Sequence, residues 1–275
     1  MIGFKRHLRP AIGLVLLVLI ACAVPIQDPR FQQRQSELLG QELGQVGGES
    51  AAVRRIYFLG IALFPESWSE NDVTEAASLL QNGARSSEFH SIILSNNLTS
   101  IPERYPAVDE QSVERAAASL AAHARPDDII FVYLSSHGSR GALVRKVGIF
   151  NQEPLRSAES QKWLTPLGER KTVIIVSACY SGSLIGSLHA ANRIVMTASR
   201  SDRQSFGCRA NARHTDFGEA LLESLAVPNQ SLAAIFAKTK ENVAVREQRD
   251  HLSPPSEPQV FVGDEMARVF EEASF

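Results

Sequence analysis

The feature that most constrains the fold is a set of short runs that are apolar throughout. Ile129 to Leu134 and Val173 to Val176 contain no charged residue, glycine or proline. A strand with one face in water would alternate apolar and polar residues, whereas such runs are typical of parallel strands covered by helices on both faces. Right-handed crossovers wind the helices onto these faces. The sequence therefore predicts an α/β fold, a three-layer sandwich with a mostly parallel central sheet of about six strands.

Strand and helix signals alternate along the rest of the chain. We expect strands at 53–59, 89–94, 129–134, 173–176, 192–198 and 259–262. Helical spacing of apolar residues predicts helices over 69–84, 109–124, 159–169, 216–225 and 230–246, with Ser69 and Asp109 as N-caps of the first two. Residues 141–150 favour a hairpin-like excursion between these elements.

The first 23 residues indicate an export signal rather than part of the fold. Basic residues precede an apolar stretch over 11–21, which is shorter than the roughly 20 residues that a membrane-spanning helix needs. Two processing sites remain open. Ala21-Cys22-Ala23 fits ordinary signal cleavage, while Leu19 to Cys22 is similar to a bacterial lipobox, in which Cys22 is acylated. We favour the lipobox, and so expect a lipid-anchored protein of the bacterial cell envelope that faces the periplasm.

The remaining chain divides into three parts. Residues 24–50 are rich in Gln and Glu and predict a polar tether, because such a composition buries little apolar surface. Residues 51–265 fit one domain, and 266–275 form a C-terminal tail. The net charge of −2, without a Lys/Arg-rich block, gives no indication of a nucleic-acid partner. No metal-ligand spacing occurs, so we expect no metal or cofactor, and the oligomeric state stays open.

Two of the expected strands lead directly into reactive side chains. His137 and Gly138 follow the first run, and Cys179 follows the second. Because the carboxyl ends of parallel strands share one edge of a sheet, an imidazole and a thiol should meet there. The imidazole can lower the pKa of the thiol, so that a thiolate is present at neutral pH, and can protonate a leaving amine. The N–H groups of Gly138 and Cys179 are the expected oxyanion donors.

The sequence allows other interpretations of these side chains. His189 and His214 are possible bases without a flanking signature, and His214 is expected to face solvent. Cys179 could instead form a disulfide with Cys208, and Cys179 would then be unable to act as a nucleophile. A serine-hydrolase elbow fails because the segment 182–186 has glycines but no central serine. A redox thiol protein is disfavoured by the lack of a Cys-x-x-Cys motif.

Several segments together resemble the legumain-type cysteine peptidases, peptidase family C13, and specifically their bacterial branch. The His-Gly and Ala-Cys-x-Ser-Gly motifs, with His137 and Cys179 separated by 42 positions, are the most specific part of the resemblance. The similar segments are Leu94–Asn97, Ser136–Ser139, Val176–Gly182, Thr197–Cys208, Thr215–Glu219 and Ser256–Gly263. They occur in order and span essentially residues 53–263.

The resemblance implies a caspase–hemoglobinase fold and a His/Cys pair that cleaves peptide bonds after asparagine or aspartate. By position, His137 would be the general base and acid and Cys179 the nucleophile. Ser177, Ser205 and Glu219 would fall at the substrate-binding pocket. Ser177 departs from the family, which has a glutamate there, and no arginine stands near the start of the first helix. A strict preference for asparagine therefore does not follow.

The sequence thus predicts an exported, lipid-anchored cysteine endopeptidase that acts on peptide or protein substrates. Two alternatives use the same fold. A transpeptidase or ligase would resolve the thioester with an amine instead of water, and a non-catalytic envelope module would only bind its partner.

Overall fold

A computed structural model of the chain describes residues 26–47, 53–83 and 88–275. A six-stranded sheet of order β11-β10-β9-β3-β1-β2 forms its centre, and only β11 runs antiparallel to its neighbour. The strands are β1 (Arg55–Ala62), β2 (Glu88–Ser95), β3 (Ile129–Ser135), β9 (Thr172–Ser177), β10 (Arg193–Thr197) and β11 (Gln259–Val262). The predicted α/β class and mostly parallel sheet are confirmed.

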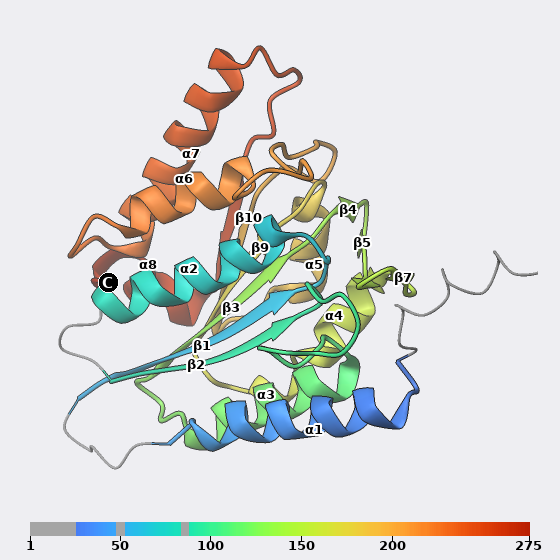
Figure 1. The fold of residues 1–275 in the computed structure, drawn as a ribbon. Helices are drawn as coiled ribbons and strands as arrows, with labels where there is room; N and C mark the ends of the chain where they lie inside the picture. Colours follow the sequence, from blue (N-terminus) through green and yellow to red (C-terminus); the bar gives the residue numbers. More distant parts are fainter. Residues whose placement is uncertain (1–25, 48–52, 84–87) are drawn as a thin grey trace, which may run out of the picture.

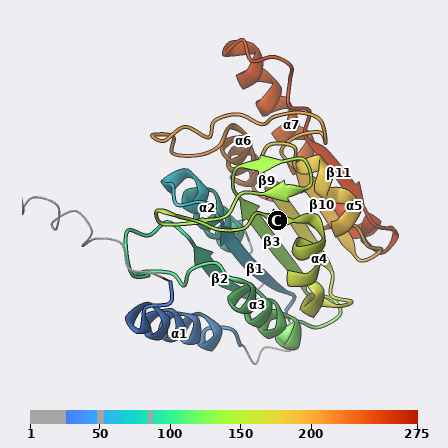
Figure 2. The same ribbon diagram turned by 90° about the vertical axis from the view of Figure 1, so that its right-hand side faces the viewer.

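Helices cover both faces of the sheet, as Figures 1 and 2 show. One face carries α2 (Ser67–Gly83), α6 (Asp216–Leu225), α7 (Leu232–Arg249) and α8 (Ala267–Glu272). The other face carries α1 (Pro29–Gly44), α3 (Glu110–His123), α4 (Ser157–Trp163) and α5 (Ile185–Leu188). Each layer has its own apolar core. Within the apolar strands, neighbouring residues such as Phe58 and Leu59 face opposite cores, because side chains alternate across a strand.

Short elements fill the connections between the strands of the sheet. The predicted excursion after β3 contains five two-residue strands, which form a three-stranded and a two-stranded antiparallel sheet. They are β4 (Gly138–Ser139), β5 (Ala142–Leu143), β6 (Lys146–Val147), β7 (Phe150–Asn151) and β8 (Leu155–Arg156). Three 3-10 turns occur in the described chain, namely η1 (Thr165–Leu167), η2 (Ser181–Leu184) and η3 (Asp264–Met266).

Three of the predicted helices differ in how well their expected ends agree with the structure. Asp109 caps α3 as expected, since its carboxylate accepts from the N–H of Ser112 at 2.7 Å. The predicted cap Ser69 is wrong, because α2 begins at Ser67 and the Ser69 hydroxyl donates to the carbonyl of Ser135 at the end of β3. The helix expected over 159–169 is split into α4 and η1, with Pro166 in the first turn of η1.

The expected polar tether over 24–50 is largely a helix that packs on the domain. In α1, Phe31, Leu38 and Leu39 are buried, Leu39 in the core beside the sheet and Phe31 in a smaller cluster with Ala107 and Val147. Gln35 is also buried, and its amide bonds the carbonyl of Ala107 at 2.8 Å and the N–H of Ala107 at 2.7 Å. The tether prediction fails here because a few apolar residues fall on one face of the helix and the buried polar group is paired.

The last ten residues are likewise part of the fold rather than a loose tail. Met266 is fully buried, and α8 follows it. The terminal Phe275 is buried and contacts Phe131 of β3 edge-on, with ring centroids 5.3 Å apart. Its N–H donates to the carbonyl of Gln230.

The predicted signal peptide and the lipidation residue Cys22 lie outside the described residues. Within the described chain, none of the helices has the length and apolar character to cross a membrane.

Candidate active site

The register of the sheet brings His137 and Cys179 to the same edge. Ser135 at the end of β3 pairs with Ser177 at the end of β9, and each reactive residue follows two positions later. A Cβ at Gly138 would lie 2.2 Å from the carbonyl oxygen of Cys179. The backbone after the histidine therefore presses directly against the backbone of the cysteine, which only a glycine at 138 permits.

Two aromatic side chains from the segment after β1 hold the His137 ring. Phe64 contacts it edge-on with ring centroids 4.5 Å apart, and Trp68 does so at 5.2 Å. Burial lowers the pKa of His137, and the carboxylate of Glu66 opposes this shift only in part. Trp68 in turn donates its indole N–H to Glu66 at 2.7 Å. The imidazole is thus fixed in place and neutral at neutral pH, as a general base must be.

The Cys179 thiol is partly buried and donates to the carbonyl of Ser205 at 3.2 Å. Burial raises the pKa of Cys179. Together with the lowered pKa of His137, this favours a resting pair of neutral thiol and neutral imidazole. The sequence predicted a thiolate in the resting state, whereas the structure favours a neutral thiol. The two differ because spacing along the chain does not reveal how deeply the sulfur is buried.

The backbone around Cys179 is held in a tight turn. Tyr180 has a φ of 57°, in the left-handed region that residues other than glycine rarely adopt. Its N–H donates to the carbonyl oxygen of Arg203 at 2.8 Å. The Ser183 hydroxyl accepts from the Gly141 N–H at 2.8 Å and donates to the Tyr180 carbonyl at 2.6 Å. It therefore links the histidine segment to the cysteine segment. Among the described residues, the Cys179 N–H donates to no other residue, which leaves it available to an oxyanion.

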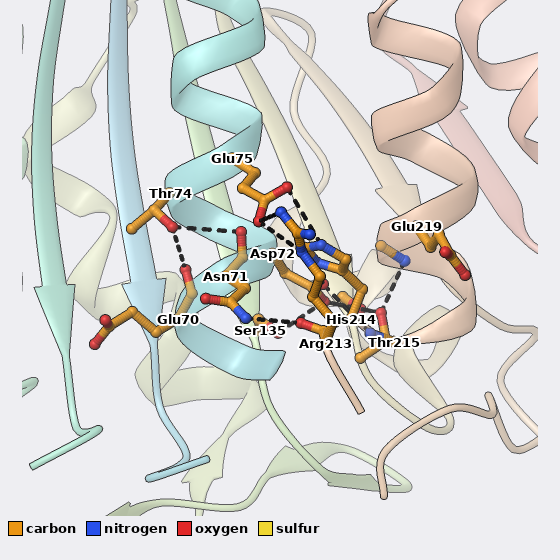
Figure 3. A network of polar contacts seen from close by, with 12 residues as sticks. Glu70, Asn71, Asp72, Thr74, Glu75, Ser135, Arg213, His214, Thr215 and Glu219 are labelled. Atoms are coloured by element: carbon orange, nitrogen blue, oxygen red, sulfur yellow. Dashed lines mark hydrogen bonds and ion pairs between the residues drawn. The ribbon is translucent and has the colours of Figure 1, made fainter. Parts of the chain in front are cut away.

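A buried carboxylate, Asp72 of α2, lies beneath the ends of both strands (Figure 3). One oxygen accepts from the Thr215 hydroxyl at 2.8 Å and is within reach of Ser135 at 3.3 Å and Ser177 at 3.5 Å. The other accepts from the ring of His214 at 3.1 Å. A single side chain thereby joins α2, β3, β9 and the start of α6.

The family model described as the peptidase C13 family matches residues 107–266, more than half of the chain. The chain belongs to the peptidase C13 family. The crystal structure of caspase-1 from Spodoptera frugiperda is similar in fold, with a TM-score of 0.52 and 12% identity over 79% of this chain and 92% of that chain. A structure of pro-sf-caspase-1 has a TM-score of 0.49 and 12% identity over 78% and 92%. No curated protein sequence matches. The resemblance and fold expected from the sequence are confirmed.

Membership in C13 places the chain in a family of cysteine peptidases. The structure shows where each predicted site residue of this C13 member lies. Ser205 supplies the carbonyl that holds the thiol. Ser177 is fully buried below the edge, where its hydroxyl bonds that of Thr215 at 2.9 Å. Its side chain therefore supports the site from beneath rather than lining it.

Glu219 is not brought to the pocket of this C13 protein. Its side chain is 55% exposed, and it pairs with Arg246 of α7 at 3.4 Å. Figure 3 shows it on the far side of α6 from Asp72. The buried residues of α6 include Phe217, Gly218 and Ala220 but not Glu219, whose carboxylate is directed to Arg246 instead. The predicted pocket role of Glu219 is therefore not supported by its position.

The alternative bases are also placed elsewhere. His189 is exposed at the end of α5, just before β10 begins, and so lies at the opposite edge of the sheet. His214 does not face solvent as expected, since its ring is only 7% exposed and sits between Asp72 at 3.1 Å and Glu75 at 3.3 Å. Charge and hydrogen bonding from these carboxylates outweigh burial and raise the pKa of His214.

Cys179 and Cys208 are both free thiols in the described chain, so the alternative disulfide is absent from this structure. Burial raises the pKa of Cys208, and the negative charges of Cys179 and Asp72 add to the shift. Cys208 is therefore a poor nucleophile and packs near the site as an apolar side chain. No group of three or more potential metal ligands occurs among the described residues.

Three site residues were missed from the sequence. Phe64 and Trp68 position the imidazole, and Asp72 joins the strand ends to α6. Asp72 carried a signal, because it falls on the apolar face of α2 one residue before the buried Val73. A polar residue on such a face predicts a buried partner, but the partners are 63 to 143 residues away along the chain.

Proposed function

We propose that the protein is a cysteine endopeptidase in which His137 and Cys179 act as the catalytic pair. The observation that carries the proposal is the shared register of β3 and β9, which places an oriented, neutral imidazole and a thiol at one sheet edge. Peptide and protein chains are the proposed substrates, in keeping with the C13 family match.

The proposed reaction begins with proton transfer from the Cys179 thiol to His137 as sulfur attacks the peptide carbonyl. The N–H groups of Cys179 and Gly138 are the proposed donors to the oxyanion, each worth about 3 kcal/mol in comparable sites. The carbon–nitrogen bond then breaks and the imidazolium protonates the leaving amine. Water, deprotonated by His137, attacks the thioester and releases the second product, which restores the thiol.

The residue before the cleaved bond is proposed to be asparagine or aspartate, as the resemblance to the legumain-type peptidases implies.

The decisive experiment is a peptide-library cleavage profile of the purified protein, read by mass spectrometry. Wild type should cut after asparagine or aspartate, and Cys179→Ala and His137→Ala should abolish cleavage while keeping the melting temperature. Cleavage that survives in Cys179→Ala would overturn the proposal. A folded wild type that cuts no peptide and is not alkylated at Cys179 would instead support a binding module.

We further propose, from the sequence alone, that the protein is lipid-anchored through Cys22 in the bacterial envelope. Metabolic labelling with a fatty-acid analogue should mark the wild type and not Cys22→Ser. Equal labelling of both, or none of either, would contradict the anchor.

A further inference from the structure

A pocket of about 260 Å³ opens at the carboxyl ends of β1 and β2, next to the candidate active site. It is lined by residues of three segments, which follow β1, begin α2 and follow β2. They include Pro65, Glu70, Ser95, Arg104 and Tyr105. Pro65 immediately follows Phe64, which contacts the His137 ring. The segment after β1 therefore both contacts the imidazole and lines the pocket.

The inner wall of the pocket carries a carboxylate without a cation. Glu70 is partly buried and accepts from the Ser95 hydroxyl at 2.6 Å. It takes part in no ion pair with any residue that the structure describes. Figure 3 shows Glu70 on the side of α2 that faces β1 and β2, away from Asp72 and His214. A partly buried carboxylate with a single hydroxyl partner is well suited to a cationic ligand.

The rim of the pocket does not neutralise this carboxylate. Arg104 is exposed, and its guanidinium lies over the ring of Tyr105, 4.9 Å from the centroid. Glu103, also exposed, adds a second acidic side chain to the lining. Tyr105 lines the same pocket as Glu70. Burial raises the pKa of Tyr105; the charge of Arg104 opposes this shift, and that of Glu70 adds to it. Both polar groups therefore face one space that favours a positive side chain.

The order of the strands gives the direction of a bound substrate. Cys179 follows β9, His137 follows β3, and β1 and β2 come next in the sheet. The carbonyl carbon must lie at the sulfur and the leaving nitrogen at the imidazole that protonates it. The peptide beyond that nitrogen therefore continues past β3 toward the ends of β1 and β2, where the pocket opens.

We propose that this pocket is a subsite for a lysine or arginine side chain in the first few residues after the cleaved bond, with Glu70 as its anionic partner. The inference rests on the proposed peptidase function and extends it to the leaving side of the substrate. Since that part of the substrate departs with the first product, the subsite contributes to acylation of Cys179 and not to hydrolysis of the thioester.

Quenched fluorescent peptides that differ only after the cleaved bond test this subsite. Each would carry Lys, Ala or Glu at one of the first few positions. We expect wild type to show about fivefold higher kcat/KM for Lys than for Ala at one of them, and Glu70→Gln to remove this preference. Glu271→Gln, an equal charge change on the exposed face of α8, should keep it.

An inhibitor that ends at the warhead separates the subsite from the catalytic pair. A peptidyl aldehyde has only a hydrogen beyond its reactive carbon, so it should inhibit wild type and Glu70→Gln with equal affinity. Cleavage of every peptide with no basic preference, or a preference that persists in Glu70→Gln, would overturn the subsite alone. Failure to cleave any peptide would overturn the proposed function and the subsite with it.

A second variant covers the case in which Glu70→Gln does not fold. Arg104→Gln removes the cation at the exposed rim and should increase the preference for Lys over Ala. An unchanged or smaller preference in that variant would contradict the proposal.

Discussion

At the scale of single residues, the two reactive side chains were readable from the sequence but their protonation was not. The strand-end positions of His137 and Cys179 follow from local patterns, because both come directly after apolar runs. Their pKa directions depend on burial among residues distant along the chain, such as Trp68 and Ser205. The outcome is a neutral resting pair, which becomes reactive only when a substrate drives the proton transfer.

This resting state predicts slow alkylation of Cys179 at neutral pH. Because burial raises the pKa of the thiol above its ordinary value, only a small fraction should be thiolate at pH 7. The rate of reaction with iodoacetamide should keep rising as pH passes 9. Peptide mass spectrometry would follow Cys179 separately from Cys208. A rate that levels off near pH 7 would instead indicate a thiolate–imidazolium pair.

At the scale of elements, the strands and most helices were predictable, whereas the contacts between their ends were not. Helical spacing located α3 and α6, and the N-cap Asp109 marked the start of α3, since these signals lie within a few residues of each other. The Asp72–His214 contact joins residues 142 positions apart. His214 was expected in solvent because its neighbours along the chain are polar, yet the fold places it beside α2.

The raised pKa of His214 predicts a pH-dependent contribution to stability. A group whose pKa is higher in the folded state stabilises the fold fully below its unfolded pKa, and this contribution is lost as pH rises through the folded pKa. The free energy of unfolding should therefore fall from pH 6 to pH 9 by about 1 kcal/mol more in wild type than in His214→Gln. Urea titrations at both pH values would measure the difference.

The same titrations on Arg213→Gln provide a control. Arg213 neighbours His214 but is 76% exposed, and it opposes the raised pKa. Its removal should preserve the pH dependence, whereas equal pH dependence in wild type and His214→Gln would contradict the prediction.

At the scale of the whole molecule, the extent of the domain was the part that sequence composition misjudged. The Gln-rich stretch before residue 50 has few apolar residues, and composition alone predicted a tether. In the structure, Glu42 of α1 accepts from the Ile93 N–H of β2 at 2.9 Å. Because β2 is an edge strand, α1 thereby covers a backbone group that would otherwise be open to pairing with another chain.

If α1 is an integral layer of the domain, truncating its buried face must destabilise the whole fold. Leu39 is 2% exposed within the core that α1 shares with α3, so Leu39→Ala should lower the free energy of unfolding by about 2–4 kcal/mol. Gln41 lies two residues later on the exposed side of α1, and Gln41→Ala should change the unfolding free energy by less than about 0.5 kcal/mol. Urea unfolding followed by tryptophan fluorescence would report both, since Trp68 and Trp163 lie on opposite faces of the sheet. A Leu39→Ala protein as stable as wild type would mean that α1 is only a tether after all.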